Sequence, residues 1–229
     1  MAPGSQAWVG IHFQLEPGWH IYWMNPGDAG LPPSVQWALP AGWSAGAIEW
    51  PAPERLSNPA GVDYGYNGEA TLLTKVKVPA TAKPGSADLN ADLKWLVCKE
   101  QCIPQNGHAK LTVQVAPKAV PDANGKQQIA LTRAKLPKTL PAEWKANVLS
   151  SPKNFLLNFM PGAKVEKAEF FPAEPQVIEN AAPQKLSSTS TRAQLSLDKS
   201  DAAAKASALK GVLVLNGTDA YLLNIPIKR

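Results

Sequence analysis

The sequence predicts an all-β protein made of two antiparallel β-sandwich domains joined by a short helical linker. Short segments alternate apolar and polar residues with a period of two, as half-buried strands do. Proline and glycine separate these segments and account for 22 and 16 of the 229 residues. Neither half alternates strands with helices, which argues against a thioredoxin fold.

The first half of the chain carries six strand-like segments, at residues 9–15, 19–23, 35–39, 70–78, 87–97 and 109–115. Pro17-Gly18 and Pro40 mark turns between them. Many short strands separated by such turns are typical of a β-sandwich. We therefore expect residues 1–117 to form the first domain.

Residues 118–140 are expected to form a linker with a short helix. Asp122 can act as its N-cap, and the helix would run to Lys135 before Pro137 ends it. The apolar face of this helix is predicted at Ile129, Leu131 and Leu136.

The second domain, residues 141–229, repeats the strand pattern at 155–159, 193–197, 211–215 and 221–227. Asn216-Gly217 lies between the last two segments and is a strong hairpin signal. Residues 199–209 are rich in alanine and lysine and predict a short helix or an irregular loop. We therefore expect residues 141–229 to form a second, smaller β-sandwich.

Charge and hydropathy exclude two classes of protein. The net charge of +5 comes from scattered lysines, whereas a nucleic-acid site needs a basic patch with interleaved aromatic residues. No apolar run approaches the roughly 20 residues of a transmembrane helix.

Residues 1–5 lack the charged and apolar regions of a signal peptide, so we expect a fragment excised from a longer protein.

Two cysteines, Cys98 and Cys102, flank Lys99-Glu100-Gln101 and are followed by Ile103-Pro104. Cys98 ends a predicted strand, and Pro104 forces an extended approach and a turn, so both thiols should lie on one tight loop. Three residues between them allow the Cα spacing that a disulfide requires.

Three interpretations of this pair compete. A structural disulfide closing so short a loop would contribute only about 2 kcal/mol. A metal site with His108 would have three ligands at an unusual spacing. A reversible dithiol, which the residues favour, fits the labile character of bonds held in short surface loops. Lys99 would favour a neighbouring thiolate, and Glu100 would oppose it.

Other residues carry weaker signals. Trp19, Trp23, Trp37 and Trp50 are expected to pack in the core and anchor turns, and the alternative is a ligand platform. His12 and His20 lie on strand-like segments and are expected to be structural. With Met24 nearby they still form no metal motif. We expect neither a metal nor a cofactor.

Four stretches together resemble a known family. They are the run from Trp19-His-Ile-Tyr-Trp23 to Pro33, Trp50-Pro-Ala-Pro-Glu-Arg55, Tyr64-Gly65-Tyr66, and Trp95-Leu-Val-Cys98-Lys-Glu-Gln-Cys102-Ile-Pro104. They resemble the amino-terminal periplasmic region of DsbD-like membrane thiol:disulfide reductases, in the branch of the suppressor-of-copper-sensitivity protein B (ScsB). Glu169-Phe-Phe-Pro-Ala-Glu174 in the second half is similar to the same branch.

The resemblance implies an immunoglobulin-like fold for the sandwich and a redox-active Cys98–Cys102 disulfide. It implies a periplasmic location and a parent protein with a transmembrane core and a thioredoxin-like domain, which would supply electrons. The acceptors would be periplasmic thioredoxin-fold or peroxiredoxin-like proteins. The fragment itself is expected to be monomeric and to bind no nucleic acid.

By analogy with the family, Cys102 would form the mixed disulfide and Cys98 would resolve it. The family also shields its disulfide with an aromatic cap, and the position of the cap phenylalanine is Asp63 here. Tyr64 or Tyr66 would serve instead, or both are core tyrosines. The further supporting candidates are Trp95, Lys99, Glu100 and Pro104.

The sequence thus predicts a thiol:disulfide oxidoreductase domain that accepts electrons from a thioredoxin-like donor and passes them on. The alternative is a non-enzymatic β-sandwich binding module with a structural disulfide. Reduction of the Cys98–Cys102 bond by a thioredoxin-like donor separates the two hypotheses.

Overall fold

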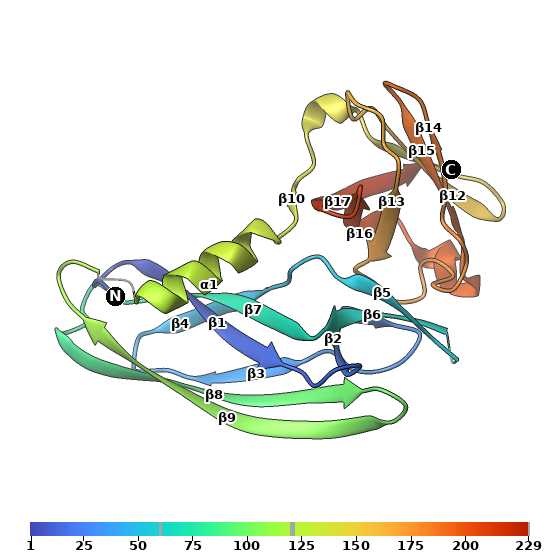
Figure 1. Ribbon diagram of the computed structural model, residues 1–229. Helices are drawn as coiled ribbons and strands as arrows, with labels where there is room; N and C mark the ends of the chain where they lie inside the picture. The colour runs from blue at the N-terminus through green and yellow to red at the C-terminus, as the bar shows by residue number, and fades with distance from the viewer. Residues whose placement is uncertain (60, 120–121, 229) are drawn as a thin grey trace. The chain divides into compact units, whose positions relative to one another are not determined.

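The computed structural model of the protein describes residues 1–59, 61–119 and 122–228 (Figure 1). Strands dominate it, which confirms the all-β prediction. Contacts group the chain into two compact units. The first contains Met1–Met24, Gly30–Pro51 and Gly65–Leu136, and the second contains Asn25–Ala29, Ala52–Tyr64 and Pro137–Arg229.

These units differ from the expected ranges 1–117, 118–140 and 141–229. The helix of the expected linker groups with the first unit, while residues 25–29 and 52–64 group with the second. The reason is visible in side-chain bonds within the second unit. Asn25 Nδ2 donates to the carbonyl of Pro172 at 2.8 Å, and Asn180 Nδ2 donates to Asp28 Oδ1 at 2.8 Å.

One sheet of the first unit is three-stranded and antiparallel, in the order β1-β7-β4. Its strands are β1 (Gln6–Gln14), β7 (Glu69–Lys77) and β4 (Ser44–Glu49). Val9, Val76 and Leu89 form a small buried cluster, as the period-two pattern predicts.

The second sheet has the order β3-β8-β2-β6-β5, and β9 pairs with β8. Its strands are β2 (His20–Gly27), β3 (Ser34–Ala38), β5 (Glu54–Asn58), β6 (Gly61–Asn67), β8 (Gly85–Cys98) and β9 (Cys102–Val115). Strand β2 meets β8 at a single antiparallel pair, His20 opposite Cys98.

Strands β8 and β9 form a long hairpin that carries both cysteines. Pairing runs from Gly85 opposite Val115 to Cys98 opposite Cys102. The sequence predicted only residues 109–115 of β9 as a strand, and Pro104 was expected to give an extended approach and a turn. Within the described residues β9 pairs with β8 alone, and such an edge strand tolerates proline.

The predicted helix is confirmed as α1 (Ala123–Ala134). The Asp122 side chain caps it by accepting a hydrogen bond from the backbone N–H of Gly125 at 2.6 Å. The helix packs on β1 and β7, where Gln128 Nε2 donates to Thr71 Oγ1. The predicted apolar face is wrong at Leu131, which is 56% exposed.

The second unit contains a sheet in the order β13-β16-β17-β11-β12-β15-β14. Its strands are β11 (Asn147–Ser150), β12 (Asn154–Phe159), β13 (Ala168–Pro172), β14 (Lys185–Ser188), β15 (Ala193–Asp198), β16 (Ala208–Leu215) and β17 (Asp219–Lys228). The short β10 (Lys138–Thr139) pairs with β17. Most pairs are antiparallel, but β10 and β11 run parallel to β17.

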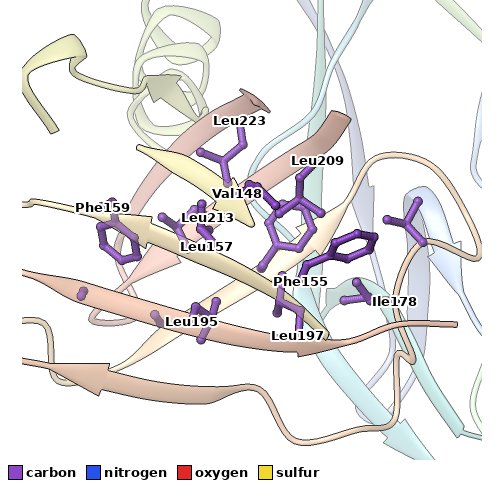
Figure 2. Packing of buried hydrophobic residues seen from close by; sticks show 14 of the residues in the cluster. Val148, Phe155, Leu157, Phe159, Ile178, Leu195, Leu197, Leu209, Leu213 and Leu223 are labelled. Carbon is purple, nitrogen blue, oxygen red and sulfur yellow. The ribbon is translucent and has the colours of Figure 1, made fainter. Parts of the chain in front are cut away.

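This sheet curves around one hydrophobic core (Figure 2). Phe170 of β13 and Leu186 of β14 come from opposite ends of the strand order, yet they pack in the same cluster. The ends must therefore face each other, as in a sandwich. The short 3-10 helices are η1 (Ala142–Trp144) and η2 (Asp201–Lys205), the latter inside the stretch predicted as a helix or an irregular loop.

Candidate redox site

The two cysteines form a disulfide at the tip of the β8–β9 hairpin. Cys98 is the last residue of β8 and Cys102 the first of β9, so the antiparallel register places them opposite each other. Their Cα atoms lie 4.2 Å apart, close to the roughly 4.5 Å of a pair without backbone hydrogen bonds. The hairpin thus brings the two sulfur atoms together without help from distant elements.

The two cysteines differ sharply in access to solvent. Cys98 exposes only 2% of its surface, whereas Cys102 is exposed. Thiol–disulfide exchange requires an incoming thiolate to reach one sulfur atom. The exposed residue, Cys102, is the one that a partner protein can reach.

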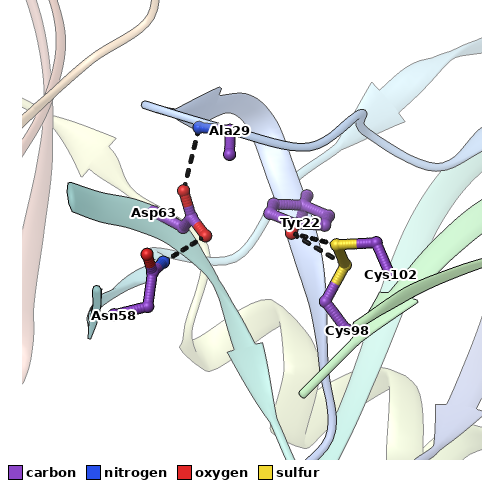
Figure 3. The surroundings of a disulfide bond; sticks show 6 residues. All are labelled: Tyr22, Ala29, Asn58, Asp63, Cys98 and Cys102. Carbon is purple, nitrogen blue, oxygen red and sulfur yellow. Dashed lines mark hydrogen bonds between the residues drawn. A yellow bond between two sulfur atoms is a disulfide. The ribbon is translucent and has the colours of Figure 1, made fainter. Parts of the chain in front are cut away.

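Tyr22 of β2 contacts both sulfur atoms through its hydroxyl group. The O–H donates to Cys98 Sγ at 2.9 Å and lies 3.4 Å from Cys102 Sγ, and Figure 3 shows it directed at the bond. The Tyr22 side chain is 1% exposed. A buried hydroxyl at this position can stabilise negative charge on Cys98 when the disulfide opens.

Gly30 allows the chain to pass close to the Tyr22 ring. Its φ angle is +90°, and a Cβ atom placed there would lie 2.2 Å from Cζ of Tyr22. Glycine adopts this backbone conformation without steric cost, and only glycine leaves room for the ring. Gly30 therefore helps to hold the hydroxyl in place.

His20 lies on the same face of β2 as Tyr22, two residues earlier, and pairs across the strands with Cys98. The two rings meet edge to face with centroids 5.2 Å apart. The His20 side chain is buried, and burial lowers the pKa of its imidazole below the ordinary 6.5. His20 is therefore neutral at pH 7.

The predicted supporting residues Trp95, Lys99, Glu100 and Pro104 all lie in the β8–β9 hairpin, but they differ in exposure. Lys99 and Glu100 are exposed in the turn, and Lys99 Nζ reaches the carbonyl of Pro17 at 3.5 Å. Trp95 is half-buried and packs edge-on against Phe13. Trp95 thus supports the hairpin by packing. Pro104 is exposed in β9 and lies opposite Leu96 of β8.

Tyr64 and Tyr66 of β6, the cap candidates, are both buried. The Tyr64 hydroxyl donates to Asn180 Oδ1 at 2.9 Å, and the Tyr66 hydroxyl donates to the carbonyl of Pro51 at 2.8 Å. Burial raises the pKa of both phenols above the ordinary value of 10. These are the contacts of packed core tyrosines.

Asp63, which the resemblance places at the family's cap position, is a buried carboxylate with its own partners (Figure 3). It accepts a hydrogen bond from the backbone N–H of Ala29 at 3.0 Å and another from Asn58 Nδ2 at 2.7 Å. Burial raises the pKa of Asp63 above its ordinary value despite these bonds. Its contacts hold the segment 25–29 against β5 and β6 within the second unit.

The geometry argues against the metal-site interpretation that included His108. His108 pairs with Asp92 and lies six positions along β9 from Cys102. At about 3.4 Å per residue this spacing is roughly 20 Å, too far for one metal ion to bridge. Among the residues that the structure describes, no group of three or more His, Cys, Asp or Glu side chains could hold a metal ion.

Reasoning from the sequence found the cysteine pair but assigned no role to Tyr22 and only a structural one to His20. Both residues reach the site through the single β2–β8 contact, which links positions 78 residues apart. The available signal was the alternation in β2, which places His20 and Tyr22 on one face of the strand.

No helix in residues 1–59, 61–119 and 122–228 is long and apolar enough to cross a bilayer. No curated protein sequence matches the chain. Among solved structures, the chain is similar to the N-terminal periplasmic domain of ScsB from Proteus mirabilis. The TM-score is 0.75 at 20% identity, over 100% of this chain and 91% of that chain.

An endo-fucoidan hydrolase of glycoside hydrolase family 107 also matches, at 11% identity over 93% of this chain and 35% of that chain. Its TM-score of 0.23 supports no shared fold. The ScsB domain, by contrast, confirms the expected immunoglobulin-like all-β fold. Residues 1–114, which include β1–β8 and the disulfide, match the family "Thiol:disulfide interchange protein DsbD, N-terminal". Through these residues the chain belongs to the family of DsbD N-terminal domains.

Proposed function

We propose that the chain is the periplasmic thiol–disulfide exchange domain of a membrane thiol reductase. The observation that carries the proposal is the asymmetry of its disulfide. Cys102 is exposed at a hairpin tip, while Cys98 is buried against the Tyr22 hydroxyl. Thiol–disulfide exchange requires one sulfur atom that an incoming thiolate can attack, and it is favoured when the other sulfur is stabilised as it leaves.

Electrons enter when a thiolate of a reduced thioredoxin-like domain attacks Cys102 Sγ. The Cys98–Cys102 bond breaks, a mixed disulfide forms with Cys102, and the electron pair moves to Cys98 Sγ. The O–H of Tyr22 stabilises this thiolate until it takes up a proton. The second thiol of the donor then releases Cys102, and the donor leaves as a disulfide.

Electrons leave by the reverse sequence with a different partner. The Cys102 thiolate attacks the disulfide of a periplasmic thioredoxin-fold or peroxiredoxin-like acceptor. Cys98 then attacks Cys102, the intramolecular bond re-forms, and the acceptor departs with both electrons. In this proposal the donor is the thioredoxin-like domain of the same parent protein, which receives electrons from a transmembrane core.

The competing function is a passive binding module whose disulfide serves stability. The hairpin weakens this alternative, because its ladder already runs from Gly85 opposite Val115 to the cysteines. A bond that closes a loop of three intervening residues adds little to such a structure.

The experiment that tests the proposal mixes the oxidised chain with a reduced thioredoxin-like donor domain. Alkylation and mass spectrometry count the thiols of the chain over time. We expect two new thiols per chain and a reduction potential above roughly −300 mV. A donor without its attacking cysteine is the control. A disulfide that resists the donor, or a potential below that range, would contradict the exchange function.

A further inference from the structure

His20 presents a nitrogen atom that lacks a partner beside the redox site. Its Nε2 atom is buried and makes no hydrogen bond in the structure. The whole residue is 9% exposed, so water does not readily satisfy this atom. Leaving a polar atom unpaired in the protein interior costs free energy. Because this atom lies beside the disulfide, its missing partner points to a group that is present only in the other redox state of the cysteine pair.

The reduced state supplies such a partner. In the oxidised protein Cys98 Sγ carries no proton, because it is bonded to Cys102. After reduction, Cys98 becomes a buried thiol, and burial in apolar surroundings raises the pKa of a thiol. This thiol must nevertheless lose its proton before it can attack the mixed disulfide at Cys102.

The backbone places the side chains of His20 and Cys98 next to each other on one face of the sheet. His20 and Cys98 are opposite each other on β2 and β8, and side chains of such a pair lie on the same face with Cβ atoms about 4.5–5.5 Å apart. The Tyr22 and His20 rings pack edge to face, with their planes at 78° to each other. The Tyr22 hydroxyl is the donor in its hydrogen bond to Cys98 Sγ, so it is not the base that takes the proton of the Cys98 thiol.

We propose that His20 is the proton acceptor that activates Cys98 for the resolving step. As Cys98 Sγ attacks Cys102 Sγ, its S–H bond breaks and the proton passes to the imidazole. The Cys98–Cys102 bond forms, the bond between Cys102 and the acceptor breaks, and the acceptor leaves as a thiolate. The imidazolium returns its proton to that thiolate or to water.

The protonation state of His20 suits this role. Burial keeps its pKa below 6.5, so the imidazole is an unprotonated base at pH 7. The other titratable groups on the surrounding elements include Tyr22 on β2, the two thiols, Lys99 and Glu100 in the turn between β8 and β9, and Glu16 just before β2. The neighbouring strand β6 carries Asp63, Tyr64 and Tyr66, and β8 carries Asp88, Asp92 and Lys94. Lys99 and Glu100 are exposed, and Tyr22 is a hydrogen-bond donor.

This inference rests on the proposed exchange function, but it can be tested without any protein partner. The reduced chain is mixed with one equivalent of dithiobis(nitrobenzoate), which releases a coloured thiolate at each step. Attack by Cys102 releases the first thiolate, and resolution by Cys98 releases the second. Stopped-flow absorbance separates the two phases across the pH range.

We expect His20→Gln to slow the second phase at pH 7 about 100-fold and to leave the first phase within about twofold of wild type. His12→Gln is the matched control, since His12 is on β1 and its Nδ1 atom pairs with Thr71 Oγ1. Circular dichroism verifies the fold of both variants. A second phase of unchanged rate in a folded His20→Gln variant would refute the role of His20.

The wild-type protein gives an independent readout if the variant does not fold. With His20 as the base, the second-phase rate levels off above the pKa of His20, which lies below 6.5. Without it, the rate keeps rising to the pKa of the thiol itself, about 8.5 or higher. A rate that rises steadily through pH 8 would overturn the inference. Failure of a thioredoxin-like donor to reduce the disulfide would instead refute the proposed function.

Discussion

The replacement of Tyr22 by phenylalanine tests the proposed site most directly. Tyr22→Phe removes one oxygen atom and keeps the buried ring, so the packing against Gly30 and His20 is preserved. The lost interaction is the O–H donation to Cys98 Sγ at 2.9 Å. In the oxidised protein the acceptor is a neutral sulfur, which accepts hydrogen bonds weakly. The oxidised fold should therefore change little.

The effect should appear when Cys98 becomes a thiolate. A hydrogen bond to a charged group contributes about 1.5–3 kcal/mol. Its loss would therefore raise the free energy of the Cys98 thiolate by a similar amount, about 1.5–3 kcal/mol. If about half of the charge has reached the departing sulfur in the transition state, reduction slows about 4- to 13-fold.

The assay is the rate of reduction of the oxidised chain by dithiothreitol at pH 7, followed by alkylation of the new thiols. Tyr66→Phe is the matched control, because its hydroxyl is also buried but donates to the carbonyl of Pro51. That variant should lose about 1 kcal/mol of stability and react at the wild-type rate. Equal reduction rates for Tyr22→Phe and wild type would refute the idea that Tyr22 stabilises the leaving sulfur.

Three further predictions concern other parts of the site. Gly30→Ala should destabilise the protein in urea by about 1–3 kcal/mol more than Gly68→Ala. Both glycines have a positive φ angle, but a Cβ at Gly68 meets no atom within 4 Å, so equal losses would exclude a clash with Tyr22. Cys98→Ala should trap a covalent complex with a thioredoxin-fold partner on non-reducing gels, because the exposed Cys102 remains; trapping by Cys102→Ala alone would reverse the roles. The free energy of unfolding of the oxidised protein should fall as the pH drops from 6.5 through the lowered pKa of His20, because the unfolded chain then binds the extra proton. His20→Gln should reduce this fall in urea titrations, and an unchanged pH dependence would show that other groups cause it.

Local patterns predicted much of the fold correctly. The cap at Asp122 and the proline after the helix placed α1 to within a residue at each end. Asn216-Gly217 predicted the β16–β17 turn, where both residues have positive φ angles. Each of these signals acts over a few neighbouring residues, which is why the sequence alone reveals it.

Pairings between distant segments could not be predicted in the same way. The parallel contact between β11 and β17 joins residues about 80 positions apart, and no local pattern specifies it. The same is true of the β2–β8 contact that brings His20 and Tyr22 to the cysteines. The sequence therefore identified the cysteine pair, but not the groups that surround it.

The hairpin that carries the disulfide has a consequence for repeated turnover. Backbone pairing continues along β8 and β9 to the cysteines themselves, and Trp95 packs against Phe13 near the tip. Opening the bond therefore frees only a three-residue turn, and the strands on either side stay paired. We therefore expect an exchange domain built in this way to alternate between its two redox states without refolding.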